Sequence, residues 1–447
     1  MKKAALHNLG CKVNAYETEA MQEMLEQAGY EIVPFKEGAD VYVINTCTVT
    51  NIADRKSRQM LHRARKLNPE AVVVAAGCYV QAQGEREIDP CIDIVIGNNH
   101  KKDLVRILRE YEENREKDRV DGQPGEESGT HTAGEIGDIN RTKEYESLHL
   151  TRTGEHTRAY IKVQDGCNQF CTYCIIPYAR GRVRSREQQD VVQEVRILAS
   201  NGYQEVVLTG IHLSSYGIDF DGRRHLLDLI RAVHEIEGIR RIRLGSLEPG
   251  IVTEEFAEAL ASMPKICPHF HLSLQSGCDA VLKRMNRKYT SGEYYEKCRI
   301  LRKYFDAPAL TTDVIVGFPG ETEAEFQESY DFVDKVDFYE THIFKYSKRE
   351  GTKAASMPDQ VDEQIKAQRS ARLIELGEKK RKAYEKKFIG RTVEVLVEED
   401  AVIGGKNVQT GHTKEYIKIA LDSEENLRNC IVNVQIDNLE YNYHWQK

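Results

Sequence analysis

The chain has 447 residues, more than one ordinary hydrophobic core holds, so we expect two to four domains. Its net charge of −8, from 63 basic and 71 acidic residues, argues against a general nucleic-acid coat protein but allows a local basic face. No run approaches the roughly twenty apolar residues of a membrane helix, and eleven cysteines without an N-terminal signal favour a soluble, cytoplasmic protein with thiolate chemistry over a disulfide framework.

Strand-like and helix-like segments alternate over the first hundred residues, which predicts an open α/β sheet. Three strand-like runs each lead to a cysteine: residues 4–7 to Cys11, 41–44 to Cys47 and 71–76 to Cys78. Because the carboxyl ends of parallel strands lie along one edge, where ligands bind, we expect these thiols to converge. Ordinary core cysteines are the alternative. Cys91 precedes its strand-like run, 92–96, so we expect it at the opposite edge as a small buried residue.

The apolar rhythm is lost after about Leu108, and charged residues give way to a stretch rich in Gly, Glu and Ser. Such a composition cannot bury enough apolar surface to offset its ordering entropy. We therefore expect an N-terminal domain over residues 1–114 and a polar linker over residues 115–152.

Strands and helices alternate again over a central domain, residues 153–383. Its strand-like runs are residues 159–164, 205–208, 239–244, 269–274, 310–316 and 339–344. Six βα units in series predict a partial (βα)6 barrel, shorter than the closed eightfold form. Residues that take part in the chemistry are then expected at the carboxyl ends of these strands.

The first of these runs leads into Cys167, Cys171 and Cys174, spaced C-x-x-x-C-x-x-C. Four thiolates close the coordination of a [4Fe–4S] cluster, whereas three leave one iron free to bind a small molecule. A zinc site or three buried thiols is the alternative, but zinc usually takes a fourth Cys or His, and none follows before His212. A Cys-x-x-Cys redox pair does not explain the third cysteine. The loop is therefore predicted to be a reaction site.

Glycines and polar residues follow the barrel strands. Glycine lets the backbone approach a cofactor closely, and polar side chains can hold a ribose or an amino-acid group. The predicted cofactor-binding residues are Tyr173, Thr209, Gly210, Ser246, Glu248, Ser273, Gln275, Gly317, Pro319 and Gly320.

The last part of the chain begins with a basic amphipathic stretch, residues 362–387, which is either a solvated helix face or a phosphate-contacting one. Short strand-like runs with glycine turns then predict a small antiparallel β-barrel over residues 384–447. Such barrels bind single-stranded nucleic acid or dock other proteins.

Together these parts resemble a radical S-adenosylmethionine (SAM) methylthiotransferase over nearly the whole chain. In that family an N-terminal domain holds an auxiliary [4Fe–4S] cluster, a barrel holds the cluster that cleaves SAM, and a C-terminal TRAM domain binds RNA. The resemblance implies two [4Fe–4S] clusters and S-adenosyl-L-methionine as cofactors. Residues 409–416 resemble the TRAM signature, with His412 where an aromatic residue is more usual. The implied cluster ligands are Cys11, Cys47 and Cys78 for the auxiliary cluster and Cys167, Cys171 and Cys174 for the catalytic one.

The segment Lys12-Val13-Asn14 after the first cysteine resembles the branch that acts on N6-threonylcarbamoyladenosine in tRNA. The implied reaction replaces the hydrogen on C2 of the adenine at position 37 with a methylthio group. One SAM supplies the methyl group, and a second is cleaved to a radical, because an aromatic C–H offers no acidic proton to acid-base side chains. Alternatives are isopentenyl-adenosine of tRNA, a ribosomal protein, or a non-catalytic iron–sulfur electron carrier that docks on RNA.

The resemblance implies three further partners: the tRNA anticodon loop, whose unpaired bases can be splayed into a pocket; a small electron-donor protein such as flavodoxin or ferredoxin; and a sulfur donor of unspecified chemistry. The remaining cysteines lack a motif context and are expected to be structural. They are Cys267, Cys278, Cys298 and Cys430.

Overall fold

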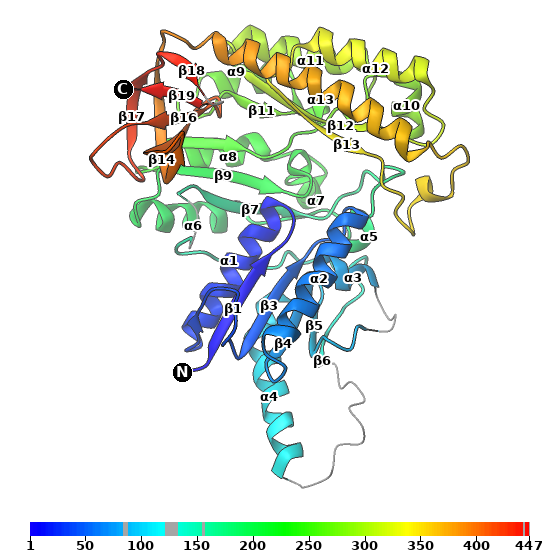
Figure 1. Ribbon diagram of the computed structural model, residues 1–447, viewed down its shortest axis with the longest axis vertical. Coiled ribbons are helices and arrows are strands. Elements are labelled where there is room, and N and C mark those ends of the chain that lie inside the picture. Colours follow the sequence, from blue (N-terminus) through cyan, green and yellow to red (C-terminus); the bar gives the residue numbers. More distant parts are fainter. Residues whose placement is uncertain (84–87, 121–132, 154–156, 441–442, 447) are drawn as a thin grey trace.

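The computed structural model describes residues 1–83, 88–120, 133–153, 157–440 and 443–446. An N-terminal α/β unit lies below a larger central unit, and a C-terminal sheet packs against one end of the central unit (Figure 1). No helix in the described ranges combines the length and the apolar character needed to cross a membrane.

The N-terminal unit is a parallel sheet with strand order β2-β1-β3-β4-β5-β6. Every residue of β3 and β4 is buried, as expected of central strands that helices cover on both faces. One face packs against α2 and α3, and the other against α1 and α4. The strands are β1 (Lys3–Asn8), β2 (Glu31–Ile32), β3 (Val41–Thr46), β4 (Val72–Gly77), β5 (Ile94–Ile96) and β6 (Ala133–Glu135). The helices are α1 (Lys12–Gln27), α2 (Asn51–Leu67), α3 (Cys78–Gln83), η1 (Lys101–Asp103) and α4 (Leu104–Val120).

The segment predicted as a polar linker, residues 115–152, is more structured than expected in its described parts. Helix α4 continues through Val120, and β6 pairs in parallel with β5 as the sixth strand of the sheet. Leu148 and Leu150 are buried beside Tyr16 of α1. Strand β6 is short and contains glycine, so its pairing depends on the open edge of β5 rather than on a strand-like pattern.

The central unit has the six predicted parallel strands in chain order. Strands β10-β9-β7 form one sheet with a short antiparallel strand, β8, and β11-β12-β13 form another. The bridges Ile242–Ile266 and Leu247–Leu272 join the two into a continuous partial barrel. The strands are β7 (Ala159–Asp165), β8 (Arg184–Ser185), β9 (Glu205–Gly210), β10 (Arg241–Leu244), β11 (His269–His271), β12 (Ala309–Val316) and β13 (Glu340–Lys345).

Helices cover the outside of this barrel (Figure 1). Capping boxes begin two of them, with Thr290 and Glu293 at α11 and Thr322 and Glu325 at α12. The helices are α5 (Ile176–Arg180), α6 (Gln188–Ser200), η2 (Leu213–Ser215), α7 (Ile218–Asp221), α8 (Leu226–His234), η3 (Pro249–Ile251), α9 (Glu254–Ala261), α10 (Asp279–Arg284), α11 (Ser291–Tyr304), α12 (Glu323–Val336) and η4 (Lys353–Ser356).

The basic stretch forms α13 (Glu363–Lys386), and several of its cations are paired within the protein. Arg369 is buried and binds Glu321 at 2.8 Å, and Arg372 binds Glu323 at 2.7 Å. Lys380 binds Asp334 at 2.8 Å. These pairs attach α13 to α12 and the loop before it, so this part of the basic stretch has a structural role rather than being a free phosphate-binding face.

The C-terminal unit is a curled sheet whose strands β17-β14-β15-β16 pair antiparallel in a half-barrel. This confirms a small β domain, but no pairing among the described residues closes the sheet into the predicted barrel. The strands are β14 (Thr392–Ile403), β15 (Lys406–Thr413), β16 (Lys418–Leu421), β17 (Ile431–Gln435), β18 (Asn438–Glu440) and β19 (Tyr443–Gln446).

The turn that resembles the TRAM signature docks on the central barrel. The ring of Tyr416 lies 4.9 Å from the Arg158 guanidinium and 4.7 Å from that of Arg243. Arg243 also donates to the Lys414 carbonyl, and Arg241 donates to the His412 carbonyl, each at 2.9 Å. At least this part of the C-terminal unit therefore holds the domains together and helps to enclose the barrel.

Candidate active site between two sets of cysteines

Cys11, Cys47 and Cys78 all lie at the carboxyl edge of the N-terminal sheet, as predicted. Strands β1, β3 and β4 are neighbours in register, so the loops that follow them meet. A side chain added at Gly10, whose φ is +110°, would come within 3.0 Å of the Cys47 sulfur, so only glycine lets the Cys11 loop pack this closely. Burial, followed by the neighbouring thiol of Cys78, raises the pKa of Cys47 to about 12.

The second set lies in the loop between β7 and α5. The Cys167 N–H donates to the Gly181 carbonyl at 3.0 Å, and the Thr172 N–H donates to the Met285 carbonyl at 3.1 Å. These bonds fix the start of the loop to the residue after α5 and its middle to the end of α10. Burial raises the pKa of Cys167 to about 11 and that of Cys174 to about 12.

Arg287, which the sequence did not single out, holds this loop from the far side of the barrel. Its Nη1 donates to the Cys171 sulfur at 3.4 Å and its Nη2 to the Ser273 carbonyl at 3.3 Å. Its Nε donates to the Tyr289 hydroxyl at 2.9 Å. Because 116 residues separate Arg287 from Cys171, no local sequence pattern predicts this contact.

The donor sets fit iron–sulfur clusters better than single ions. A tetrahedral zinc ion brings its thiolates within about 4 Å of one another, but in neither set do the three sulfurs lie within 4.8 Å of each other in the described structure. Each set also receives a guanidinium N–H on a sulfur, from Arg180 at Cys78 and from Arg287 at Cys171. Hydrogen bonds to the ligating sulfurs are one means by which proteins tune iron–sulfur clusters.

A buried ionic network joins the two cysteine sets. Four cations surround two carboxylates, and the positive surplus lies beside Cys78. Arg180 Nε donates to the Cys78 sulfur at 3.1 Å, while its Nη1 lies 2.5 Å from Glu17 and 3.2 Å from Asp165. Asp165 is two residues before Cys167. The other cations are Lys101, 3.0 Å from Glu17; Lys162, 2.6 Å from Asp165; and Arg184, 3.7 Å from Asp165.

The network keeps both carboxylates ionised although burial opposes their charge. Burial alone would raise the pKa of Glu17, but Arg180, Lys101 and Lys162 lower it well below its usual range. The pKa of Asp165 is likewise lowered, against burial, by Lys162, Arg180 and Arg184. The two units are therefore joined by the buried ion pairs of Glu17 with Lys162 and Arg180.

The residues predicted to bind the cofactor do lie at the carboxyl ends of barrel strands. Ser246 is exposed and lines a cavity in the barrel. Several others form hydrogen bonds with protein groups. The Glu248 carboxylate accepts from the Gly250 N–H at 3.0 Å, and the Ser273 carbonyl accepts from the Tyr289 hydroxyl at 2.6 Å. The Gln275 N–H donates to the Asp313 carbonyl at 2.9 Å. Thr209 is buried, and the Tyr173 ring packs on Phe318.

The glycines also have structural reasons within the protein, beside their predicted approach to a cofactor. Gly317 has φ +72°, and a side chain there would overlap Lys366 of α13. The Gly317 N–H donates to Glu321 at 2.7 Å, and the Gly320 N–H donates to the Asp359 carbonyl at 2.8 Å. Pro319 is buried in the same turn, and an added side chain at Gly210 would overlap Gln164. Packing therefore restricts Gly317 and Gly210 to glycine, and a contact of these residues with the cofactor stays a prediction.

A cavity of about 350 Å³ lies inside the partial barrel, and all three units line it. Lys12 comes from the N-terminal unit, Ser246 and Asp313 from the barrel, and Tyr416 from the C-terminal unit. Lys12 directly follows Cys11. Its side chain is accessible to solvent because it borders the cavity, although protein groups surround it on its other sides. The pKa of Lys12 is lowered to about 8, by burial among protein groups and then by the cations Arg243 and Arg158.

A larger cavity, of about 1200 Å³, shares no lining residue with the first. Chain neighbours of three cysteines line it: Thr48, Tyr79 and Ile175. Its basic side chains include Arg349, which binds Asp54 at 2.6 Å and so joins α2 to the end of the barrel.

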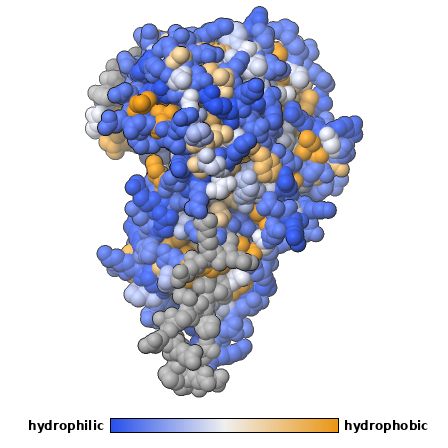
Figure 2. Space-filling model, turned by 90° about the vertical axis from the view of Figure 1, so that its right-hand side faces the viewer, coloured by the Kyte–Doolittle hydropathy of each residue, from blue (hydrophilic) through white to orange (hydrophobic). Residues whose placement is uncertain are grey.

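The face toward the viewer in Figure 2 is mainly hydrophilic, with apolar side chains in scattered small groups. The visible surface on that side suits a polar partner.

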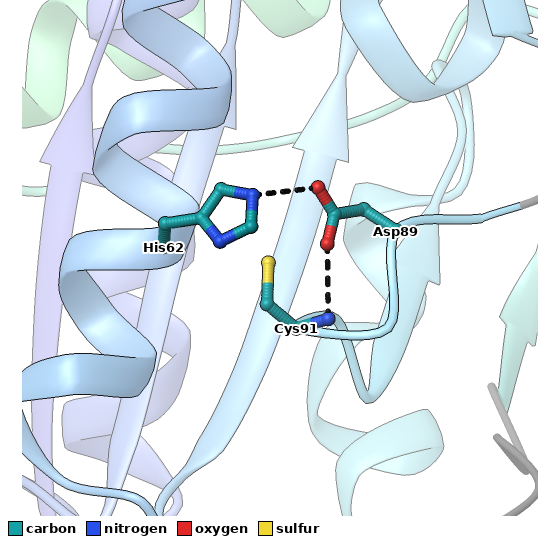
Figure 3. Close-up of side chains that lie close together, drawn as sticks. All are labelled: His62, Asp89 and Cys91. Carbon is teal, nitrogen blue, oxygen red and sulfur yellow. Dashed lines mark hydrogen bonds and ion pairs between the residues drawn. The ribbon is translucent and has the colours of Figure 1, made fainter.

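Cys91 lies apart from both sets, as predicted, at the opposite edge of the N-terminal sheet. It is buried, and its sulfur points toward the ring of His62 near the end of α2 (Figure 3). His62 pairs with Asp89 at 2.8 Å, and Asp89 accepts from the Cys91 N–H at 3.1 Å. Burial, followed by Asp89, raises the pKa of Cys91 to about 12, which favours the neutral thiol.

His212 makes the stability of the barrel depend on pH. Burial, followed by Arg287 and Arg224, lowers the pKa of His212 to about 4. The unfolded chain therefore binds more protons below about pH 6.5, and the contribution of this residue is complete above that pH and lost toward pH 4, by about 1.4 kcal/mol per pH unit. We expect the thermal midpoint of the wild type to fall more steeply between pH 7 and pH 5 than that of His212→Gln. Parallel pH profiles for the two proteins would contradict this.

Two protein-family models match the chain, one in the central unit and one in the N-terminal unit. The model of the Radical SAM superfamily matches residues 161–333, and that of Uncharacterized protein family UPF0004 matches residues 3–97. The chain is 41% identical to the threonylcarbamoyladenosine tRNA methylthiotransferase MtaB of Bacillus subtilis, over 99% of this chain and 95% of the relative. It is 35% identical to the tRNA-2-methylthio-N(6)-dimethylallyladenosine synthase of a Thermoanaerobacter species, over 96% and 89%.

A solved structure shares the fold. The radical S-adenosylmethionine methyltransferase TsrM from Kitasatospora setae superposes with a TM-score of 0.55 and 18% identity, over 77% of this chain and 73% of that one. The identity and coverage of the methylthiotransferase relatives show that the chain is an enzyme that uses S-adenosyl-L-methionine and [4Fe–4S] clusters. The chain belongs to the tRNA methylthiotransferases of the radical SAM superfamily.

Proposed function

We propose that this enzyme methylthiolates C2 of N6-threonylcarbamoyladenosine at position 37 of tRNA. The relative from Bacillus subtilis, which carries that substrate in its name, supports the choice of nucleoside. One observation carries the assignment: a single barrel cavity is lined by Lys12 beside Cys11, by residues of several barrel strands, and by Tyr416 of the C-terminal unit. A base that enters this cavity meets all three units.

The two cysteine sets have different proposed roles. We propose that Cys11, Cys47 and Cys78 hold the auxiliary cluster and that Cys167, Cys171 and Cys174 hold the cluster that binds SAM. With three cysteines for each cluster, one coordination position would stay open, and the bound clusters would supply the sulfur for transfer and the radical that activates an aromatic C–H bond. The chain's own residues orient these groups: Arg180 and Arg287 donate to one sulfur of each set.

Electrons must come from another molecule, and we propose a small electron-donor protein such as flavodoxin or ferredoxin. Cys171 and Cys174 are only partly buried, so their loop is within reach of a docked partner. We also propose that the enzyme acts in the cytoplasm, where tRNA is modified; its eleven cysteines are all free in the structure.

Mass spectrometry of tRNA nucleosides tests the function. We expect a methylthio increment on threonylcarbamoyladenosine in cells that carry this chain, and the unmodified parent nucleoside to accumulate when the chain is removed. A chain with Cys47→Ala serves as the control, because it retains the second cysteine set. An increment on isopentenyl-adenosine instead would change the substrate but keep the chemistry, and no change in any tRNA nucleoside would refute the proposal.

A further inference from the structure

The barrel cavity has two walls of different chemistry. One wall carries the cations Lys12, Arg158 and Arg243, and the guanidinium groups of both arginines lie against the ring of Tyr416. The other wall carries His271, Asp313 and His342. The side-chain nitrogen and oxygen atoms of these three residues lie within 4.8 Å of one another. Glu340 and Thr311 also line the space. A ligand with an anion at one end and hydrogen-bonding groups along its length matches this arrangement.

The cationic wall is not fully neutralised by its neighbours. Arg243 is paired with Glu205 at 2.9 Å, and Arg158 Nη2 lies 3.3 Å from Glu398. Arg158 Nη1, however, is buried without a hydrogen-bond partner, and Lys12 forms no ion pair or hydrogen bond within the described part of the chain. Glu205 attracts Lys12 electrostatically but forms its ion pairs with Arg241 and Arg243, and Glu398 forms an ion pair with His412.

The opposite wall has spare hydrogen-bonding capacity as well. His271 Nδ1 contacts the Thr311 hydroxyl at 3.0 Å, but its Nε2 is buried without a hydrogen bond and lies 3.4 Å from Asp313. His269 Nδ1 is also buried without a partner. Buried polar groups are normally satisfied, so these atoms indicate a polar ligand in the space between them.

We infer that this cavity binds the threonylcarbamoyl group of the substrate, with Lys12 and Arg158 facing its carboxylate. The inference rests on the proposed function and deepens it, because it names the residues that select the nucleoside. The hydroxyl and urea groups of the ligand then face His271 and Asp313. Lys12 directly follows Cys11, so recognition of the N6 substituent and the proposed auxiliary site share the start of α1.

The same wall selects against isopentenyl-adenosine. An isopentenyl group is apolar and has no anion, so its entry would remove water from Lys12 and Arg158 without replacing the lost interactions. A site built to bond polar substrate groups rejects analogues that lack them far more strongly than an apolar pocket rejects a shape change. Lys12 is thus assigned as a specificity-determining residue.

Four synthetic anticodon stem-loops, identical except at position 37, test the inference. They carry threonylcarbamoyladenosine, its carboxyl methyl ester, isopentenyl-adenosine or plain adenosine. Dissociation constants are measured by fluorescence anisotropy with the cluster-loaded enzyme under anaerobic conditions at one fixed salt concentration. We expect the acid to bind roughly tenfold or more tightly than its ester, as for a hydrogen-bonded charge pair.

Substitution of the protein provides the second arm. Lys12→Gln should remove most of the preference for acid over ester and leave binding of the plain adenosine loop within about twofold of wild type. Lys36→Gln, an exposed lysine of the same unit outside the cavity, is the matched control and should keep the preference. Iron content is measured for each variant; if Lys12→Gln loses iron, Arg158→Gln replaces it.

The experiments distinguish failure of the inferred carboxylate recognition from failure of the proposed function. Equal binding of acid and ester by the wild type, or an unchanged preference in Lys12→Gln, would overturn the role of the cationic wall. The same RNAs are incubated with SAM, a reductant and a sulfide source, and the methylthio product is measured by mass spectrometry. Product on the threonylcarbamoyl loop without discrimination against the ester retains the function and refutes the inference, whereas no product on that loop refutes the function.

Discussion

Replacement of Cys171 with alanine is expected to abolish reductive cleavage of S-adenosyl-L-methionine, and 5′-deoxyadenosine should fall below detection. Cys171 is one of only three thiols in its loop and accepts an N–H from Arg287, so its loss removes both a proposed ligand and an anchor. Replacement of Cys47 should instead stop methylthio transfer while cleavage continues, because Cys47 lies in the other unit. Each variant should lose about half of the iron.

The measurements are chromatography of 5′-deoxyadenosine, mass spectrometry of the RNA product, and iron analysis. Cys298→Ala is the matched control: Cys298 is a fully buried cysteine of α11 outside both sets, and its replacement should keep both activities. Loss of cleavage in Cys47→Ala together with its retention in Cys171→Ala would exchange the roles of the two sets. Retention of full iron in either variant would refute the assignment of its ligands.

The second large effect is expected at Arg180. Arg180→Ala removes a fully buried guanidinium that pairs with Glu17 and Asp165, and loss of one partner from such a site typically costs about 3–5 kcal/mol of folding free energy. Lys101 and Lys162 still face Glu17, which places the effect toward the lower end of that range. We expect a lower thermal midpoint and faster proteolysis between the N-terminal unit and the barrel.

Arg180→Lys separates charge from geometry. A lysine keeps the positive charge but cannot bridge Glu17, Asp165 and the Cys78 sulfur in one planar group. It should recover part of the stability and still alter the auxiliary set, visible as a changed EPR signal or reduction potential. Arg106→Ala, which removes an exposed cation of the N-terminal unit, is the control and should have little effect. A thermal midpoint unchanged in Arg180→Ala would show that the network does not hold the domains together.

The sequence by itself determined the parallel strands and the sites where they end. Apolar runs such as residues 41–44 and 71–76 predict central strands, and parallel pairing then brings Cys11, Cys47 and Cys78 to one edge. The Cys167, Cys171 and Cys174 spacing is local, so it needed no knowledge of the fold. The capping boxes of α11 and α12 are local in the same way.

Tertiary structure decided everything that depends on residues far apart in the chain. Arg180 reaches Cys78 across 102 residues, and Arg287 reaches Cys171 across 116. Strand β6 exists because β5 offers an open edge, and the packing of Lys366 of α13 leaves no room for a side chain at Gly317. The sequence linked Lys12 to a substrate only by family resemblance, whereas the cavity that α1, the barrel and Tyr416 enclose gives its side chain a place to meet that substrate. Local patterns specify backbone geometry and burial, whereas a charged side chain's partners depend on which surfaces packing brings together, and that information is spread over the whole chain.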